Sequence, residues 1–305
     1  MIKVLRLFIL MILGFFLVGC GENKKEPSMD GRINVVTTTT MITDMVKQIG
    51  GDKIKLKSLM GPGVDPHLYD PIPTDAIALT EADIIFYNGL KLEGQMSSDL
   101  KKLDGIALSS AINKDLIQGD ESYPDPHIWG NATMWSNCIP LVVDALSEQD
   151  SKNAEYYKSS GAKLIEKYNA LHRWAIERVS GISEEARILI TSHDAFEYFG
   201  NAYGFKVVGL QGISTATEAG ISERVKLVDF IKENKVKAIF VESSVSPDAI
   251  KSIAEDSGAI IGGELFSDAM GEPGEMESFN GDRYDLGTYE GMIKHNINTV
   301  VESLK

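Results

Sequence analysis

The sequence predicts an α/β protein of two lobes, each a mainly parallel sheet flanked by helices, joined by one long connector helix. Apolar β-branched runs alternate with segments of helical periodicity through the first half, and the same alternation resumes later. Between them, residues 151–180 contain no proline and a single glycine. With 305 residues the chain is long enough for two domains. We expect an N-terminal lobe over 33–150, a connector helix over 151–181 and a C-terminal lobe over 182–305.

The N-terminal lobe is predicted from short apolar runs separated by helical segments. The expected strands are 33–38, 54–60, 84–87 and 106–108. The expected helices are 41–49, 74–82 with Thr74 as its cap, 94–103 and 131–146.

The connector helix is predicted from one apolar stripe, formed by Leu164, Tyr168, Leu171 and Ala175 at steps of four and three residues. In the C-terminal lobe the expected strands are 187–191, 205–210, 238–241 and 259–262. The expected helices there are 194–203, 222–233, 247–257 and 288–304. Two similar lobes joined by a helix suggest a cleft between them.

The N-terminus has the features of a bacterial secretory signal. Lys3 and Arg6 precede an apolar run over 7–18, which is short for a membrane span. The following Leu-Val-Gly-Cys resembles a lipobox, so residues 1–19 are predicted to be a signal peptide and Cys20 to be lipidated. Residues 20–32 then form a flexible tether. We therefore expect an extracytoplasmic protein anchored to the membrane by lipid.

The remaining composition excludes one class of partner. A formal net charge of -14 argues against nucleic acid, which requires clustered Lys and Arg. Acidic charge favours the approach of a cation, although it serves solubility equally well. Cys138 is the only other cysteine, and we expect it to be a small buried apolar residue in a helix.

Three of the five histidines and one aspartate stand in loops or at strand ends. These are His67 in GVDPHLYDP, His127 in YPDPHIWGN, His193 in ITSHDAFEYFG and Asp268 in ELFSDAMG. Ligands of open α/β sheets gather beyond the carboxyl ends of strands, so we expect all four to face one cleft, two from each lobe. Three imidazoles and a carboxylate suit zinc and are compatible with manganese or iron.

Several neighbouring residues are candidates for supporting roles. The proline of each DPH motif constrains the backbone before the imidazole. Asp65 and Asp125 either orient the rings or cap turns, and Glu242 is a further candidate acceptor. Trp129 and Phe196 are candidates to wall the site from water, although packing alone would explain them. His172, in the predicted connector helix, is expected to be a solvent-facing or packed residue, and His295, in the last predicted helix, to be a surface residue.

The segments GVDPHLYDP, DPHIWGN, SHDAFEYFGNAYGFKVVGLQGIS, FVESSVSP and GGELFSDAMG resemble the metal-binding receptors of bacterial ABC importers for zinc and manganese. The resemblance is to the TroA-like branch of that solute-binding family and runs from about residue 33 to the end. It implies a monomeric binding protein, not an enzyme, that delivers a divalent metal ion to an ABC permease in the membrane. The ligands that it implies are His67, His127, His193 and Asp268.

The resemblance also bears on the metal. In this family the third ligand is a histidine or a glutamate, and the glutamate form accompanies manganese. His193 therefore favours Zn²⁺. Many zinc members carry a histidine-rich loop before the second ligand, whereas residues 113–125 contain no histidine. Mn²⁺ therefore remains an alternative to the preferred Zn²⁺.

Two other functions remain alternatives. A secreted zinc hydrolase would need an open metal position and a general base, for which Glu242 or Glu264 is a candidate. No HExxH segment occurs in the sequence. A surface adhesin lipoprotein is the second alternative, and it would need a host ligand and no importer.

Overall fold

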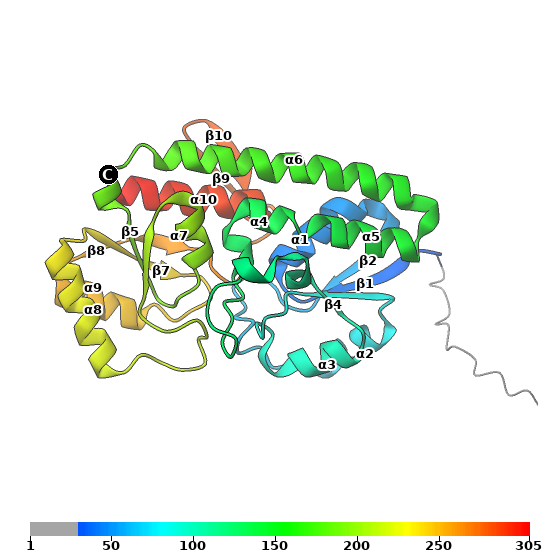
Figure 1. Cartoon of the computed structure of the whole chain (residues 1–305), viewed down its shortest axis with the longest axis horizontal. Coiled ribbons are helices and arrows are strands. Elements are labelled where there is room, and N and C mark those ends of the chain that lie inside the picture. Colours follow the sequence, from blue (N-terminus) through cyan, green and yellow to red (C-terminus); the bar gives the residue numbers. More distant parts are fainter. Residues whose placement is uncertain (1–29) are drawn as a thin grey trace, which may run out of the picture.

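The computed structural model describes residues 30–305 and contains two α/β halves beneath a long helix (Figure 1). The predicted signal peptide and Cys20 lie outside the described residues. Within the described range, no helix has the length and apolar character needed to cross a membrane.

The N-terminal half contains a four-stranded parallel sheet in the order β2-β1-β3-β4. Val35 in the central strand pairs with Leu56 on one side and Ile84 on the other. The strands are β1 Ile33–Thr37, β2 Ile54–Ser58, β3 Ile84–Tyr87 and β4 Ile106–Ala107. The helices are α1 Thr40–Gly50, α2 Pro73–Glu81, α3 Ser97–Lys102, α4 Ala132–Ser136 and α5 Ile139–Gln149.

The C-terminal half contains two parallel pairs of strands, β5 with β6 and β7 with β8. Strands β5 and β7 lie next to each other, so the two pairs form one layer. The strands are β5 Ile188–Thr191, β6 Lys206–Gly209, β7 Ala238–Glu242 and β8 Ile260–Leu265. The helices here are α7 Glu197–Tyr203, α8 Ile221–Asn234 and α9 Asp248–Ser257. The predicted fold class, with parallel sheets flanked by helices and a long helix, is confirmed.

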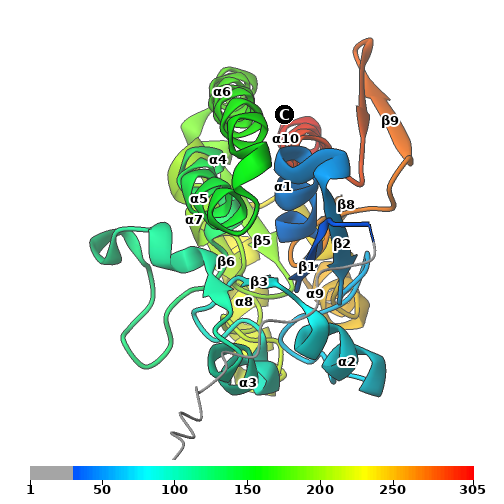
Figure 2. The same cartoon turned by 90° about the vertical axis from the view of Figure 1, so that its right-hand side faces the viewer.

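The long helix α6 spans Ala154–Val179, 26 residues, and buries the predicted stripe. Helix α10, Tyr289–Leu304, runs beside it in both views (Figures 1 and 2). Beneath these helices the largest apolar cluster continues from one half into the other. It includes Val35 and Met41 from the first half and Leu189, Phe240 and Leu265 from the second. The two halves are therefore joined by a shared core as well as by the connector.

Three local features differ from the sequence predictions. The helix predicted over 131–146 is two helices, because Pro140 in the first turn of α5 has no N–H to continue the hydrogen bonding. Cys138 lies buried at this junction. Thr74 is not the cap of α2: the helix begins at Pro73, and the Asp75 carboxylate accepts the backbone N–H of Ile72 at 3.0 Å.

The third difference is an antiparallel hairpin of β9 Met276–Phe279 and β10 Asp282–Asp285, which the sequence analysis did not predict. Figure 2 shows it projecting beside α10. His295 in α10 supports it, because its Nδ1 lies 2.7 Å from Glu277. Its Nε2 lies 2.9 Å from the Glu264 carbonyl oxygen. His295 is thus half-buried and packs against the hairpin, so the expectation of a surface residue was wrong.

Candidate metal centre

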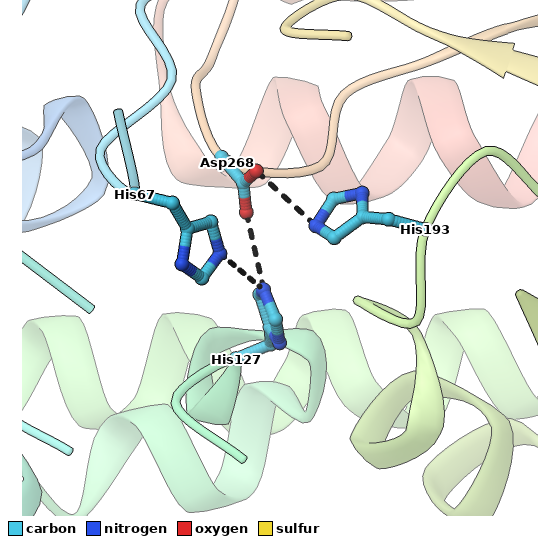
Figure 3. A group of neighbouring side chains, drawn as sticks. All are labelled: His67, His127, His193 and Asp268. Atoms are coloured by element: carbon cyan, nitrogen blue, oxygen red, sulfur yellow. Dashed lines mark hydrogen bonds and ion pairs between the residues drawn. The ribbon is translucent and has the colours of Figure 1, made fainter. Parts of the chain in front are cut away.

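The four predicted residues come together from four different loops (Figure 3). His67 lies between β2 and α2, and His127 lies in the loop before α4. His193 follows β5, and Asp268 follows β8. One potential ligand atom from each residue lies within 4.8 Å of the others. His127, His193 and Asp268 are buried, whereas His67 is half-buried.

The spacing of the donor atoms suits a small tetrahedral ion. The Nε2 atoms of His67 and His127 are 3.4 Å apart. Asp268 Oδ1 lies 3.3 Å from His127 Nε2, and Asp268 Oδ2 lies 3.3 Å from His193 Nε2. With metal–ligand bonds of about 2.0–2.1 Å, the edges of a tetrahedral site are about 3.3–3.4 Å. These three distances match such edges, and all four residues offer a donor atom within 4.8 Å of the others.

Two carboxylates fix the rings of His127 and His193. Asp125 Oδ1 lies 2.7 Å from His127 Nδ1 and accepts the backbone N–H of the same residue at 3.0 Å. Glu242 Oε2 lies 2.6 Å from His193 Nδ1, while Oε1 accepts the His193 backbone N–H at 2.8 Å. A proton held at Nδ1 leaves the lone pair at Nε2, on the side where the four residues meet.

The two DPH motifs differ in how their aspartates are used. Asp125 both caps the turn and orients the ring of His127. Asp65 caps the turn, because its Oδ1 accepts the backbone N–H of His67 at 2.8 Å. Its Oδ2 accepts a hydrogen bond from the Thr215 hydroxyl at 2.6 Å. The sequence carried no signal for Thr215.

Trp129 packs against the site, whereas Phe196 belongs to the core behind it. The Trp129 ring lies 5.3 Å from that of His127, and its Nε1–H donates to the Ser267 carbonyl at 2.9 Å. Phe196 is buried against Phe199. Trp129, two residues after His127, is thereby linked to Ser267, the residue before Asp268.

Burial and charge shift the pKa values of the four residues in different directions. Burial lowers the pKa of His67 to about 4. Burial also lowers the pKa of His127, but the carboxylates of Asp125 and Asp268 outweigh it and raise that pKa to about 9. Glu242 and Asp268 likewise outweigh burial and raise the pKa of His193 well above its usual value. Burial disfavours the Asp268 carboxylate, yet the facing imidazoles hold its pKa well below the usual range. When no ion is bound, His127 and His193 therefore carry positive charge next to these carboxylates.

Four buried polar atoms of His193, Glu242 and Asp268 make no hydrogen bond to the described residues. Two of them, His193 Nδ1 and Glu242 Oε2, form an ion pair at 2.6 Å. The other two face the centre of the cluster. They are His193 Nε2 and Asp268 Oδ1, although each has an oppositely charged neighbour at 3.3 Å. A buried polar group without a hydrogen bond costs about 1–3 kcal/mol. A cation between them would satisfy both atoms.

The fold and this cluster define a class: an α/β protein of two parallel-stranded halves with three histidines and one aspartate buried where the halves meet. A family model described as "Zinc-uptake complex component A periplasmic" matches residues 35–303. The chain belongs to this family, and the resemblance inferred from the motifs is confirmed.

Relatives and solved structures are similar to this chain over nearly its whole length. The manganese-binding lipoprotein MntA of Bacillus subtilis is 40% identical over 302 residues, covering 95% of this chain and 96% of MntA. The zinc-binding protein TroA of Treponema pallidum is 39% identical over 290 residues, covering 92% of this chain and 91% of TroA. The solved structure of TroA superposes with a TM-score of 0.85 at 38% identity, covering 90% of this chain and 99% of that one.

Proposed function

We propose that the protein is the extracytoplasmic receptor of an ABC importer. It captures a divalent metal ion with His67, His127, His193 and Asp268 and delivers the ion to a permease in the membrane. The observation that carries the proposal is the gathering of four donor atoms within 4.8 Å of one another, from three buried residues and one half-buried residue, with two rings held in place by carboxylates. Membership of the zinc-uptake family supports the transport role.

Zn²⁺ is the proposed preferred cargo, with Mn²⁺ as the second candidate. Three nitrogen donors and one carboxylate form the shell that zinc favours. Manganese prefers oxygen donors, and Asp268 is the one carboxylate of the proposed shell. The relatives include proteins named for each metal, so the nitrogen-rich shell is the observation that supports zinc.

Metal analysis combined with uptake tests the proposal. Protein purified from its own host should contain one zinc or manganese ion, and a strain lacking the gene should lose uptake of that metal. Restoring the gene should restore uptake, whereas a copy carrying His193→Ala should not. Normal uptake in the deletion strain would refute the transport role.

The hydrolase alternative fits the site less well. Four protein ligands close a tetrahedral shell and leave no position for a water nucleophile. Both oxygens of Glu242 face His193, so this carboxylate is not free to act as a base. We therefore propose a receptor without enzymatic activity. Metal-dependent hydrolysis of any substrate in a panel of esters and peptides would contradict this proposal.

The adhesin alternative predicts a different result. An adhesin would bind a host ligand, and deletion of its gene would leave metal uptake unaltered.

The membrane anchor is proposed from Cys20 in the lipobox-like segment, together with relatives that are named lipoproteins. Replacement of Cys20 by serine should release the protein from the membrane fraction and abolish its labelling with radioactive palmitate. We also propose that the protein is a monomer, which light scattering of the purified protein would test. The lobe boundaries at 150 and 182 remain predictions.

A further inference from the structure

We infer that the hydrogen bond between Asp65 and Thr215 is a latch between the two halves that holds His67 on the metal and sets how slowly the metal leaves. The inference rests on the proposed function. Asp65 and Thr215 are positioning residues, because neither is among the four proposed ligands.

The first contact of the latch is with the backbone of His67. One oxygen of Asp65 accepts the His67 N–H at 2.8 Å, and the other accepts the Thr215 hydroxyl at 2.6 Å. The same carboxylate therefore fixes the loop that carries one proposed ligand and reaches across to the other half. Hydrogen bonds to an ionised acceptor are stronger than those between neutral groups.

On the other side, Thr215 belongs to a loop tied to the strand end that carries His193. The backbone N–H of Leu210 donates to the Thr191 carbonyl at 3.0 Å, and that of Gln211 donates to Ser192 at 2.9 Å. The N–H of Asp194 donates back to the Gly212 carbonyl at 3.3 Å. Thr215 itself is 8% exposed. Thr215 thus lies three residues after a segment that is hydrogen-bonded to the His193 strand end, and its hydroxyl links that segment to the His67 loop.

This contact differs from other hydrogen bonds that join the halves near the site, including the buried bond from the Tyr198 hydroxyl to the Asp125 carbonyl. The Trp129 indole donates to the Ser267 carbonyl, and the Tyr289 hydroxyl donates to the Trp129 carbonyl. Both bonds are buried, each uses a main-chain atom, and they lie beside His127 and Asp268. The Asp65–Thr215 bond joins two side chains, is partly buried and lies at His67.

The position of the latch explains why it would act on release. His67 is the one proposed ligand that is not fully buried, so solvent reaches the site from its side. A metal ion can leave there once the His67 loop moves away. The Thr215 hydroxyl restrains that movement, whereas it makes no contact with the donors themselves.

The experiment measures zinc release from the metal-loaded full-length protein into excess chromogenic chelator by stopped flow. Thr215→Val keeps the shape of the side chain and removes the hydroxyl, and Thr215→Ala removes it with a smaller side chain. Both variants should release zinc about ten-fold faster. This factor corresponds to a free energy of about 1.4 kcal/mol, which is near the low end of the stabilisation by a hydrogen bond to a charged group. Thr215→Ser, which keeps the hydroxyl, should release zinc at the unsubstituted rate.

Thr217→Val is the matched control, because Thr217 is exposed in the same loop. It should leave release unchanged, and the rate of zinc capture should be the same in all variants. Unaltered release in both hydroxyl-free variants would overturn the latch, as would equal acceleration by Thr217→Val or by Thr215→Ser. Absence of tight zinc and manganese binding by the unsubstituted protein would instead refute the proposed function, and the latch with it.

Discussion

Glu242, at the end of β7, holds His193 by two atoms at once. One carboxylate oxygen accepts the backbone N–H of His193 at 2.8 Å, and the other lies 2.6 Å from its ring Nδ1. Both groups are buried. Main chain and ring are thus fixed together, so that Nε2 faces Asp268.

Replacing Glu242 by glutamine should weaken metal binding about 10- to 100-fold, the usual cost of losing a partner of a metal-bound histidine. The amide oxygen can still accept the backbone N–H, but the amide N–H₂ then faces Nδ1. The ring proton moves to Nε2 and blocks the lone pair needed by the metal. Competition with a chelator of known affinity measures the change.

Glu264→Gln is the control for this variant, because Glu264 is an exposed carboxylate on the neighbouring strand β8. It should bind metal as the unsubstituted protein does. Equal affinity of the Glu242→Gln and Glu264→Gln proteins would show that the His193 tautomer is not set by Glu242.

Removing a proposed ligand should have a larger effect. His193→Ala should lower affinity by orders of magnitude and leave the far-ultraviolet circular dichroism spectrum unchanged. His172→Ala is its control, because His172 lies in α6 and packs on Tyr203. Titration calorimetry of both variants tests the assignment, and retained tight binding by His193→Ala would refute it.

Affinity should rise with pH between pH 7 and about 9. The raised pKa values of His127, about 9, and of His193 mean that both rings are imidazolium ions at pH 7 when no metal is bound, with a proton on each nitrogen. The metal must displace one of these protons from each ring, so binding at pH 7 should release about two of them. The pKa of His67, lowered to about 4, adds no dependence in this range.

Calorimetry in buffers with different ionisation enthalpies counts the released protons. If His127 and His193 had the ordinary histidine pKa of about 6.5, the metal affinity would level off above pH 7. A metal affinity that does not change between pH 7 and 9 would therefore contradict the raised pKa values of His127 and His193.

Most of the architecture could be predicted from local patterns. Each predicted strand corresponds to an observed one, because buried parallel strands appear as short apolar runs. The meeting of His67, His127, His193 and Asp268 was likewise predicted, since three of them follow strand ends. Their role as ligands remains a prediction.

Other features depend on contacts between distant segments and leave no local pattern. Thr215 and Asp65 are 150 residues apart, and nothing in QGISTATEAG marks this threonine. The packing of α10 beside α6 also arises only from tertiary contacts. The β9–β10 hairpin, in contrast, has a local signal that was not used: the two-residue turn Asn280-Gly281, with both residues at positive φ. Glu242 could be singled out because it ends a strand beside the expected cleft.

Metal binding should change the overall dimensions of the protein very little. The largest apolar cluster runs through both halves, and a close-packed interior resists deformation. The radius of gyration from small-angle X-ray scattering should be the same within error with and without metal. A clear compaction on adding metal would show that the halves move as separate bodies.

The shared core also determines how the molecule unfolds. Leu189 and Phe240 belong to the same cluster as Val35 and Met41, so neither half can lose its packing without exposing apolar surface of the other. We therefore expect the two halves to unfold together in one cooperative transition. An ion bound at one point where the halves meet consequently stabilises all of it against unfolding.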